Sequence, residues 1–333
     1  MSNDRGAVAL VSGAYIWWGS SAIFWNELSS VSPTDQLSYR VITAFLYLTV
    51  GVGLLRTRLT RVGIEASLFA PGALRSHLTR RHLLYGAGAA IMISSNWALF
   101  LWAVSNGQAV EAALGYFLMP FFSVALGVAI LGERLRPLQV AALTLSAVGI
   151  VWTVITVGRL PLIAIFVGLT FAVYGFLRKQ GPWDALSGVT FETGFLLPVF
   201  GASLLIRGIG GSSVFGDGSA YTLLLITLTG LVTIIPLVSF GSAARRVPLA
   251  VIGLLQYINP TLQFLVGWQV LGESVGGDRL LGFVWIWVAL ALIVFDELGS
   301  KRPVDGLSAS GDQRLVGSTE RTTAEKAAVR RER

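Results

Sequence analysis

The sequence predicts an all-α polytopic membrane protein with ten transmembrane helices, arranged as two inverted five-helix repeats. Hydrophobic residues make up 54% of the 333 residues, whereas charged residues make up only 13%, about half the share of a soluble domain. The mean hydropathy is +0.70, and the charges cluster between long apolar runs. A stretch in the first half of the chain also recurs in the second half, which indicates the repeat.

Ten apolar runs each contain about 20 residues, the length that a membrane-spanning helix needs. In chain order they cover residues 6–27, 34–55, 82–105, 109–131, 137–157, 160–178, 185–206, 220–244, 248–271 and 279–298. The small residues at 19–22, Gly-Ser-Ser-Ala, leave a cleaved signal peptide as an alternative for the first run. An uncleaved helix is favoured because the repeat requires the first span.

Basic residues predict the orientation of these helices. With a cytoplasmic N-terminus, thirteen Arg and Lys residues fall on the cytoplasmic side, against three on the outer side. This asymmetry follows the positive-inside rule, so both termini are expected in the cytoplasm. The loop at about 57–81 and Arg56 just before it carry six of the thirteen; the loop is expected to be a plain basic loop or to hold a short interfacial helix. The polar tail, 300–333, is expected to be cytoplasmic and disordered.

The repeat is visible without any gap. Residues 108–133 read QAVEAALGYFLMPFFSVALGVAILGE, and residues 248–273 read PLAVIGLLQYINPTLQFLVGWQVLGE. A shift of 140 aligns a proline, a glycine and the final Leu-Gly-Glu. The two stretches fall in the fourth and ninth expected helices, an odd number of helices apart, so they cross the membrane in opposite directions. Residues 1–157 and 158–299 are therefore the expected units of an inverted repeat, an architecture common in secondary transporters.

Pro120 and Pro260 occupy the same position in the two copies, near the middle of their helices. A proline inside a helix removes one backbone hydrogen bond and clashes with the preceding turn. In lipid, the freed carbonyl must find a partner in the protein or in water. The two prolines therefore predict two kinked helices that face a cavity, with a static packing kink as the alternative.

Three charged residues, Arg40, Glu111 and Glu192, fall inside expected helices, where a charge costs at least about 2.5–3.5 kcal/mol. Arg40 and Glu111 lie at one depth near the outer side, so we expect them to pair. Such a pair would anchor a charged substrate or gate the outer mouth; a static ion pair is the alternative. Glu192 lies in the inner half of its helix, within reach of Arg178 and Lys179, and would serve in a structural pair or a proton relay.

Uncharged polar and aromatic residues complete the candidate substrate site. They are Asn96, Trp97, Tyr116, Gln256, Tyr257 and Asn259. Those just before Pro260 can bind a substrate or satisfy backbone groups that the break sets free.

The stretch SSNWALFLWAVSNGQAVEAALGYFLMPFFSVALGVAILGERLRPLQ at 94–139 resembles the RarD family, a branch of the EamA group in the drug/metabolite transporter superfamily. FAVYGFLRK at 171–179, ETGFLLP at 192–198 and LLQYINPTLQFL at 254–265 carry the likeness into the second half. The resemblance implies two inverted five-helix EamA units around a central substrate cavity, in a permease of the inner (cytoplasmic) membrane. Members are commonly labelled chloramphenicol-sensitive or chloramphenicol-resistance permeases.

Secondary transport is the function that these features favour, with export of a small metabolite or drug-like solute by alternating access. The sequence has no G-x-x-x-x-G-K-[ST] loop to bind ATP, so a coupling ion such as a proton, or the solute's own gradient, is expected to drive it. No cofactor, metal or nucleic acid is expected. A non-transporting scaffold or sensor subunit is the alternative. An intramembrane enzyme is less favoured, because cysteine is absent and both histidines, His77 and His82, fall in the basic loop.

Reporter fusions test the expected topology. A fusion after Arg61 and one after Arg246 should both report a cytoplasmic location, whereas a fusion after Gly216 should report an external one. Alkaline phosphatase and fluorescent-protein activities measure these locations. A cytoplasmic signal from the fusion after Gly216 would overturn the ten-helix topology.

Overall fold

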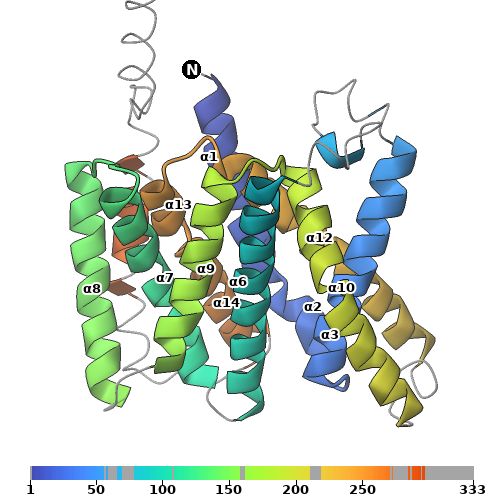
Figure 1. Cartoon of the computed structure of the whole chain (residues 1–333). Coiled ribbons are helices and arrows are strands. Elements are labelled where there is room, and N and C mark those ends of the chain that lie inside the picture. The colour runs from blue at the N-terminus through green and yellow to red at the C-terminus, as the bar shows by residue number, and fades with distance from the viewer. Residues whose placement is uncertain are drawn as a thin grey trace, which may run out of the picture. The chain divides into compact units, whose positions relative to one another are not determined.

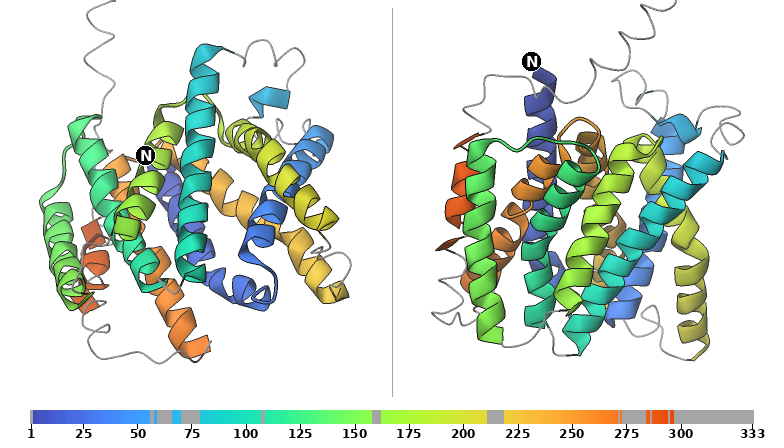
Figure 2. Two further views of the ribbon diagram at one scale, coloured as in Figure 1. Left: turned by 60° about the horizontal axis from the view of Figure 1, so that its bottom comes forward. Right: turned by 60° about the vertical axis from the view of Figure 1, so that its left-hand side comes forward.

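The computed structural model describes residues 2–55, 58, 66–69, 79–106, 109–157, 162–210, 219–270, 272, 284–285, 287–293 and 295–296. Over these residues the fold is all-helical and contains no β-strand (Figure 1), which confirms the all-α part of the predicted fold class. The helices run side by side between two common ends, as both views in Figure 2 show.

The helices follow the chain in a simple order. The first half forms α1 (Ser2–Ser20), α2 (Ala22–Glu27), α3 (Pro33–Leu46) with its π-helical continuation η1 (Tyr47–Val52), the 3₁₀ turn η2 (Ser67–Phe69), α6 (Arg80–Ser105), α7 (Ala109–Ala129) and α8 (Pro137–Val157). The second half forms α9 (Leu162–Gln180), α10 (Ala185–Ile209), α12 (Ala220–Ala244), α13 (Leu249–Leu255) and α14 (Ile258–Leu265) with the π-helical segment η3 (Val266–Val270).

Nine of the ten expected helices correspond to helical segments among the described residues. Seven of these segments are long and apolar enough to cross a membrane: Arg5–Glu27, Pro33–Leu55, Arg80–Ala103, Leu162–Gln180, Ala185–Ile209, Ala220–Ala244 and Leu249–Val270. The apolar parts of α7 and α8 found by the same criterion are shorter, Gly115–Ala129 and Pro137–Trp152. In the tenth expected helix, 279–298, the described residues 284–285, 287–293 and 295–296 are also helical, whereas the tail at 300–333 lies outside the described residues.

One expected helix, 6–27, is divided at Ser21 into α1 and α2. The sequence around Ser21 is rich in small residues. One of them, Gly19, lies where α1 meets α14. A side-chain Cβ at Gly19 would come within 2.6 Å of the Leu262 Cβ and 2.9 Å of the Asn259 carbonyl oxygen. Glycine at this position therefore lets α1 pack closely on α14, as small residues do at helix interfaces in membranes.

The two halves of the chain share local features at positions that the expected repeat relates to each other. Helix α3 begins at Ser32, whose hydroxyl accepts from the backbone N–H of Asp35, and α10 begins at Asp184, whose carboxylate accepts from the N–H of Ser187. These caps lie 152 residues apart, with the serine and the aspartate exchanged. Each Leu-Gly-Glu also carries a left-handed glycine, with φ 67° at Gly132 and 70° at Gly272, a conformation that glycine adopts without strain.

Glu133 ties the first half of the chain to the start of α13. Its two carboxylate oxygens accept hydrogen bonds from the backbone N–H groups of Leu249 (2.7 Å) and Ala250 (2.8 Å). Lys179 lies 3.8 Å from the same carboxylate and donates to the Val247 carbonyl (2.5 Å). Because no side chain on the flanking Pro248 caps α13, Glu133 satisfies two of the N–H groups left open at this helix N-terminus. We call this side of the bundle the Glu133 end.

The opposite side, the Arg207 end, is held by a second ion pair. Arg207 lies at the end of α10 and binds both carboxylate oxygens of the buried Asp35, at 2.8 and 3.1 Å. It also donates to the Ser32 hydroxyl at 3.0 Å. The start of α3 is thereby fixed to the end of α10, a role that the sequence alone did not assign to Arg207.

The substitution Glu133→Ala tests the cap on α13. Removing both acceptors leaves two helix N–H groups and Lys179 without their partner, which should cost about 1–2 kcal/mol. We expect a lower melting temperature of the full-length protein in detergent. The control Glu27→Ala removes an exposed carboxylate that accepts from Tyr221 and should change stability little. Equal losses for the two variants would contradict the capping role.

Candidate functional site

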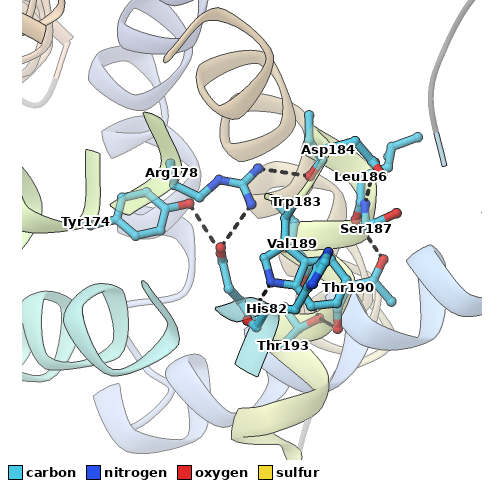
Figure 3. A network of polar contacts seen from close by, with 12 residues as sticks. His82, Tyr174, Arg178, Trp183, Asp184, Leu186, Ser187, Val189, Thr190 and Thr193 are labelled. Carbon is cyan, nitrogen blue, oxygen red and sulfur yellow. Dashed lines mark hydrogen bonds and ion pairs between the residues drawn. The ribbon is translucent and has the colours of Figure 1, made fainter. Parts of the chain in front are cut away.

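A buried ion pair lies inside the bundle near the Glu133 end. Arg178 of α9 and Glu192 of α10 face each other at 3.1 Å, with both side chains only 3% exposed. Tyr174 donates its hydroxyl to the second Glu192 oxygen at 3.3 Å, and Arg178 also donates to the Ala185 carbonyl (Figure 3). Arg178, Glu192 and Tyr174 form the Arg178 cluster. The structure thus gives Glu192 the partner that the sequence suggested, on a helix and not in a loop.

Two glycines make room for the Arg178 guanidinium. A Cβ at Gly188 of α10 would overlap one terminal nitrogen of Arg178, and a Cβ at Gly241 of α12 would overlap the other. The guanidinium therefore fills a space between α10 and α12 that any larger residue would close. Its Nε has no hydrogen-bond partner among the described residues. Such a pair is costly to break, because the remaining charge would be buried alone.

An aromatic layer adjoins this cluster. It joins α1, α9 and α12 through the rings of Tyr15, Trp18, Phe171, Tyr174 and Phe240. The Tyr174 and Phe240 rings are stacked at 5.8 Å, and the Trp18 ring meets Phe171 edge-on at 5.8 Å. Tyr15 donates its hydroxyl to the Ile252 carbonyl of α13 at 3.0 Å. The Arg178 cluster and the aromatic layer together fill the bundle toward the Glu133 end.

His82 stands beside this region. It lies in the first turn of α6, not in the basic loop where the sequence placed it, and its ring packs edge-on against Trp183. Trp183 donates its indole N–H to the His82 carbonyl at 2.9 Å (Figure 3). The hydrogen bond joins α6 to the turn between α9 and α10. His77 lies outside the described residues.

A second polar cluster surrounds Arg40 of α3. Its guanidinium carbon lies 4.0 Å from the ring centre of Trp97 in α6 and 5.0 Å from that of Trp25 in α2. Arg40 donates through Nε to the Thr233 hydroxyl of α12 at 2.9 Å, and the Tyr116 hydroxyl of α7 interacts with it electrostatically. We call these five residues the Arg40 cluster. Among the described residues, no ion pair neutralises Arg40.

The expected pair between Arg40 and Glu111 stays a prediction. Glu111 lies in the first turn of α7, but its side chain is not among those that the structure describes. Arg40 nonetheless gathers side chains from four other helices, in both halves of the chain. The sequence did not indicate Trp25 or Thr233 as its neighbours.

Two further candidates, Asn96 and Tyr116, occupy defined positions. Asn96 is buried and donates its side-chain amide to the Val167 carbonyl at 2.7 Å and to the Thr170 hydroxyl at 3.3 Å. It therefore holds α6 against α9. The Tyr116 ring packs edge-on against Phe100 of α6 at 5.4 Å, so that its hydroxyl belongs to the Arg40 cluster while its ring belongs to the α6–α7 interface.

The expected helix 248–271 is interrupted at Gln256 and Tyr257, between α13 and α14. The break precedes Pro260 by one turn, because Pro260 has no N–H to donate to the Gln256 carbonyl. The N–H of Asn259 bonds that carbonyl instead, at 3.0 Å. Helix α7, in contrast, continues through Pro120. A break thus accompanies one proline of the expected pair; the kinks themselves stay predictions.

The three polar residues at the break differ in what they leave free. Asn259 accepts from Gln263 at 3.0 Å, and Tyr257 is fully buried with its hydroxyl 3.5 Å from the Phe117 carbonyl. Gln256 is 1% exposed, and its side-chain oxygen has no partner among the described residues. Gln256 is therefore the residue at the break whose side-chain acceptor is left unpaired among the described residues.

The comparisons with known proteins agree with one another. The EamA-like transporter family matches residues 5–155. Protein RarD of Escherichia coli (strain K12) is 35% identical over 298 residues, which cover 90% of this chain and 97% of that protein. Protein RarD of Streptomyces exfoliatus is 40% identical over 291 residues, covering 87% and 88%. A solved structure titled "Crystal structure of protein" matches with a TM-score of 0.62 at 20% identity, over 87% of this chain and 97% of that one, which shows a shared fold.

Glycine-to-alanine substitutions in α10 test the space around Arg178. Gly188→Ala should displace the guanidinium and break the pair with Glu192, at a cost of about 3–5 kcal/mol. Gly201→Ala, in the same helix with no atom within 4 Å of the added Cβ, should be neutral or stabilising by up to about 1 kcal/mol. The yield and melting temperature of monodisperse protein measure both effects. A Gly188→Ala protein as stable as Gly201→Ala would refute the proposed fit.

Proposed function

Because the chain belongs to the RarD family of EamA-like transporters, within the drug/metabolite transporter superfamily, we propose that it is a secondary transporter. It moves a small metabolite or drug-like solute across the cytoplasmic membrane by alternating access, in the direction of export. The Arg40 cluster carries this proposal. A guanidinium with open donor groups, surrounded by residues from helices of both halves, is what a solute site between two moving units requires.

The inverted repeat supports alternating access. In the proposed architecture, residues 1–157 and 158–299 form five-helix units of opposite orientation around a central cavity. The exchanged helix caps of α3 and α10 and the matching left-handed glycines, Gly132 and Gly272, favour this arrangement. Secondary transporters with such repeats place their substrate sites near the membrane midplane, between the repeats.

The orientation follows from charge. Several basic residues that the positive-inside count places in the cytoplasm gather at the Glu133 end, in or beside its turns: Arg134, Arg136, Lys179, Arg245 and Arg246. In our proposal this end faces the cytoplasm and the Arg207 end faces outward. Both termini and the basic loop are then cytoplasmic. The Arg178 cluster and the aromatic layer would close the cytoplasmic side in the described conformation.

A scaffold or sensor subunit is the alternative function. Such a protein has no need for an interior cation with free donors or for a buried acceptor such as that of Gln256. These features cost stability in a membrane interior, and a passing solute gives them a purpose. Transport is therefore favoured over a purely structural role.

Solute movement tests the proposal. On overexpression, we expect the concentration of one solute class to fall inside cells and to rise in the medium. In a deletion strain, both concentrations should change in the opposite direction. The purified protein in liposomes should then exchange that labelled solute in a counterflow assay. Pro260→Ala, which returns a donor to the Gln256 carbonyl, should slow counterflow while leaving the protein folded. Absence of any such solute, together with no counterflow, would favour the scaffold.

A further inference from the structure

We propose that Arg40 binds the carboxylate of the transported solute, so that the substrate class is a small monocarboxylate with an aromatic or apolar body. This inference rests on the proposed transport function and names the chemistry of the same site. It follows from how the Arg40 guanidinium is held, which donors remain open, and how the other described cations are occupied.

Aromatic rings cover Arg40, and its edge donors remain. With its guanidinium carbon 4.0 Å from the Trp97 ring centre and 5.0 Å from that of Trp25, the cation lies within cation–π distance of two indoles. A guanidinium carries five N–H donors in its own plane. Only Nε donates a hydrogen bond among the described residues, to Thr233. The terminal nitrogens keep their donors for another group.

Thr233 fixes the direction in which these donors point. Its hydroxyl proton goes to the Thr229 carbonyl, 2.8 Å away on the same helix. The oxygen lone pair is therefore what faces Arg40, and it accepts from Nε. The edge formed by the two terminal nitrogens is left open, and its two parallel N–H groups match the two oxygens of a carboxylate.

The charge balance favours a monoanion. The other buried or half-buried cations with described partners are neutralised: Arg136 by Asp296, Arg178 by Glu192, Lys179 by Glu133 and Arg207 by Asp35. Among the side chains that the structure describes, Arg40 is thus the interior cation without a counter-ion. A carboxylate would neutralise it, whereas a dianion such as a phosphate monoester would leave one negative charge in an apolar surrounding.

The walls indicate the remainder of the solute. Trp25 and Trp97 lie against the cation, Tyr116 interacts with it electrostatically, and Phe100 lies edge-on to Tyr116. Aromatic walls with few polar groups suit an apolar or aromatic body beside the anionic group. A strongly polar solute, such as a sugar acid, would find few hydrogen-bond partners here.

Paired carboxylates and amides test the inference on the purified full-length protein in detergent. Benzoate, phenylacetate and indole-3-acetate are compared by calorimetry with their uncharged amides. We expect saturable binding of at least one acid, with its amide at least about tenfold weaker, since a charge-assisted bidentate contact is lost. Arg40→Gln should abolish that preference. Arg40→Lys keeps the positive charge but lacks the two parallel N–H donors of a guanidinium, so it should still prefer the acid but bind it more weakly.

The matched control is Arg246→Gln, which removes an exposed arginine whose Nε bonds the Ser242 carbonyl of its own turn; binding should not change. Size-exclusion profiles establish whether each variant is folded. If Arg40→Gln is not folded, the binding measured for Arg40→Lys tests the inference in its place. The inference is overturned if none of the acids binds, if amides bind equally, or if an Arg40 variant binds as well as the parent. Counterflow of a neutral solute that ignores Arg40 would overturn the inference but preserve transport. Acid binding that depends on Arg40, without any counterflow, would preserve the carboxylate site but overturn the proposed transport.

Discussion

Backbone groups inside this bundle need partners in the protein or in water, because hydrocarbon offers none. Two prolines inside helices illustrate this constraint, because each leaves one backbone carbonyl without its usual donor. Pro236 of α12 cannot bond the Val232 carbonyl, and Trp17 of α1 donates its indole N–H to that oxygen at 3.0 Å. Pro260 leaves the Gln256 carbonyl to the N–H of Asn259. Interhelical packing and helix breaks are thus two answers to one requirement.

Arg40 and Glu192, two interior charges that the expected repeat relates to each other, meet this requirement in different ways. Glu192 is neutralised by Arg178 and bonded by Tyr174, and glycines on two helices shape the space around them. Arg40 receives aromatic rings and one hydroxyl. The first arrangement is self-sufficient and holds helices together. The second leaves donors that a solute could use, so in our proposal the charge in one expected repeat unit serves structure and its counterpart in the other serves binding.

Hydropathy predicted the helices well because run length and apolar composition are local properties; the expected span 220–244 coincides with α12. Partners across helices were harder. Arg178 was found because it is close to Glu192 in sequence, whereas Thr233 beside Arg40 and Gly241 beside Arg178 come from distant segments whose packing no local pattern encodes. Glu133 was recognised as a mark of the repeat, but its capping of α13 depends on how the halves meet. The break at Gln256 lay one turn before the expected proline, as the geometry of the lost hydrogen bond dictates.

A carboxylate at Arg40 would also explain how an apolar interior can carry a charged solute. Alone, the guanidinium resists exposure to hydrocarbon by at least about 2.5–3.5 kcal/mol, so the empty protein rearranges against that cost. With the anion bound, the pair is neutral and the cost falls. Binding energy would then lower the barrier to reorientation, and the loaded protein would change state faster than the empty one. Such a transporter exchanges solutes more readily than it returns empty, because the constraint that selects the substrate also makes its presence a condition for movement.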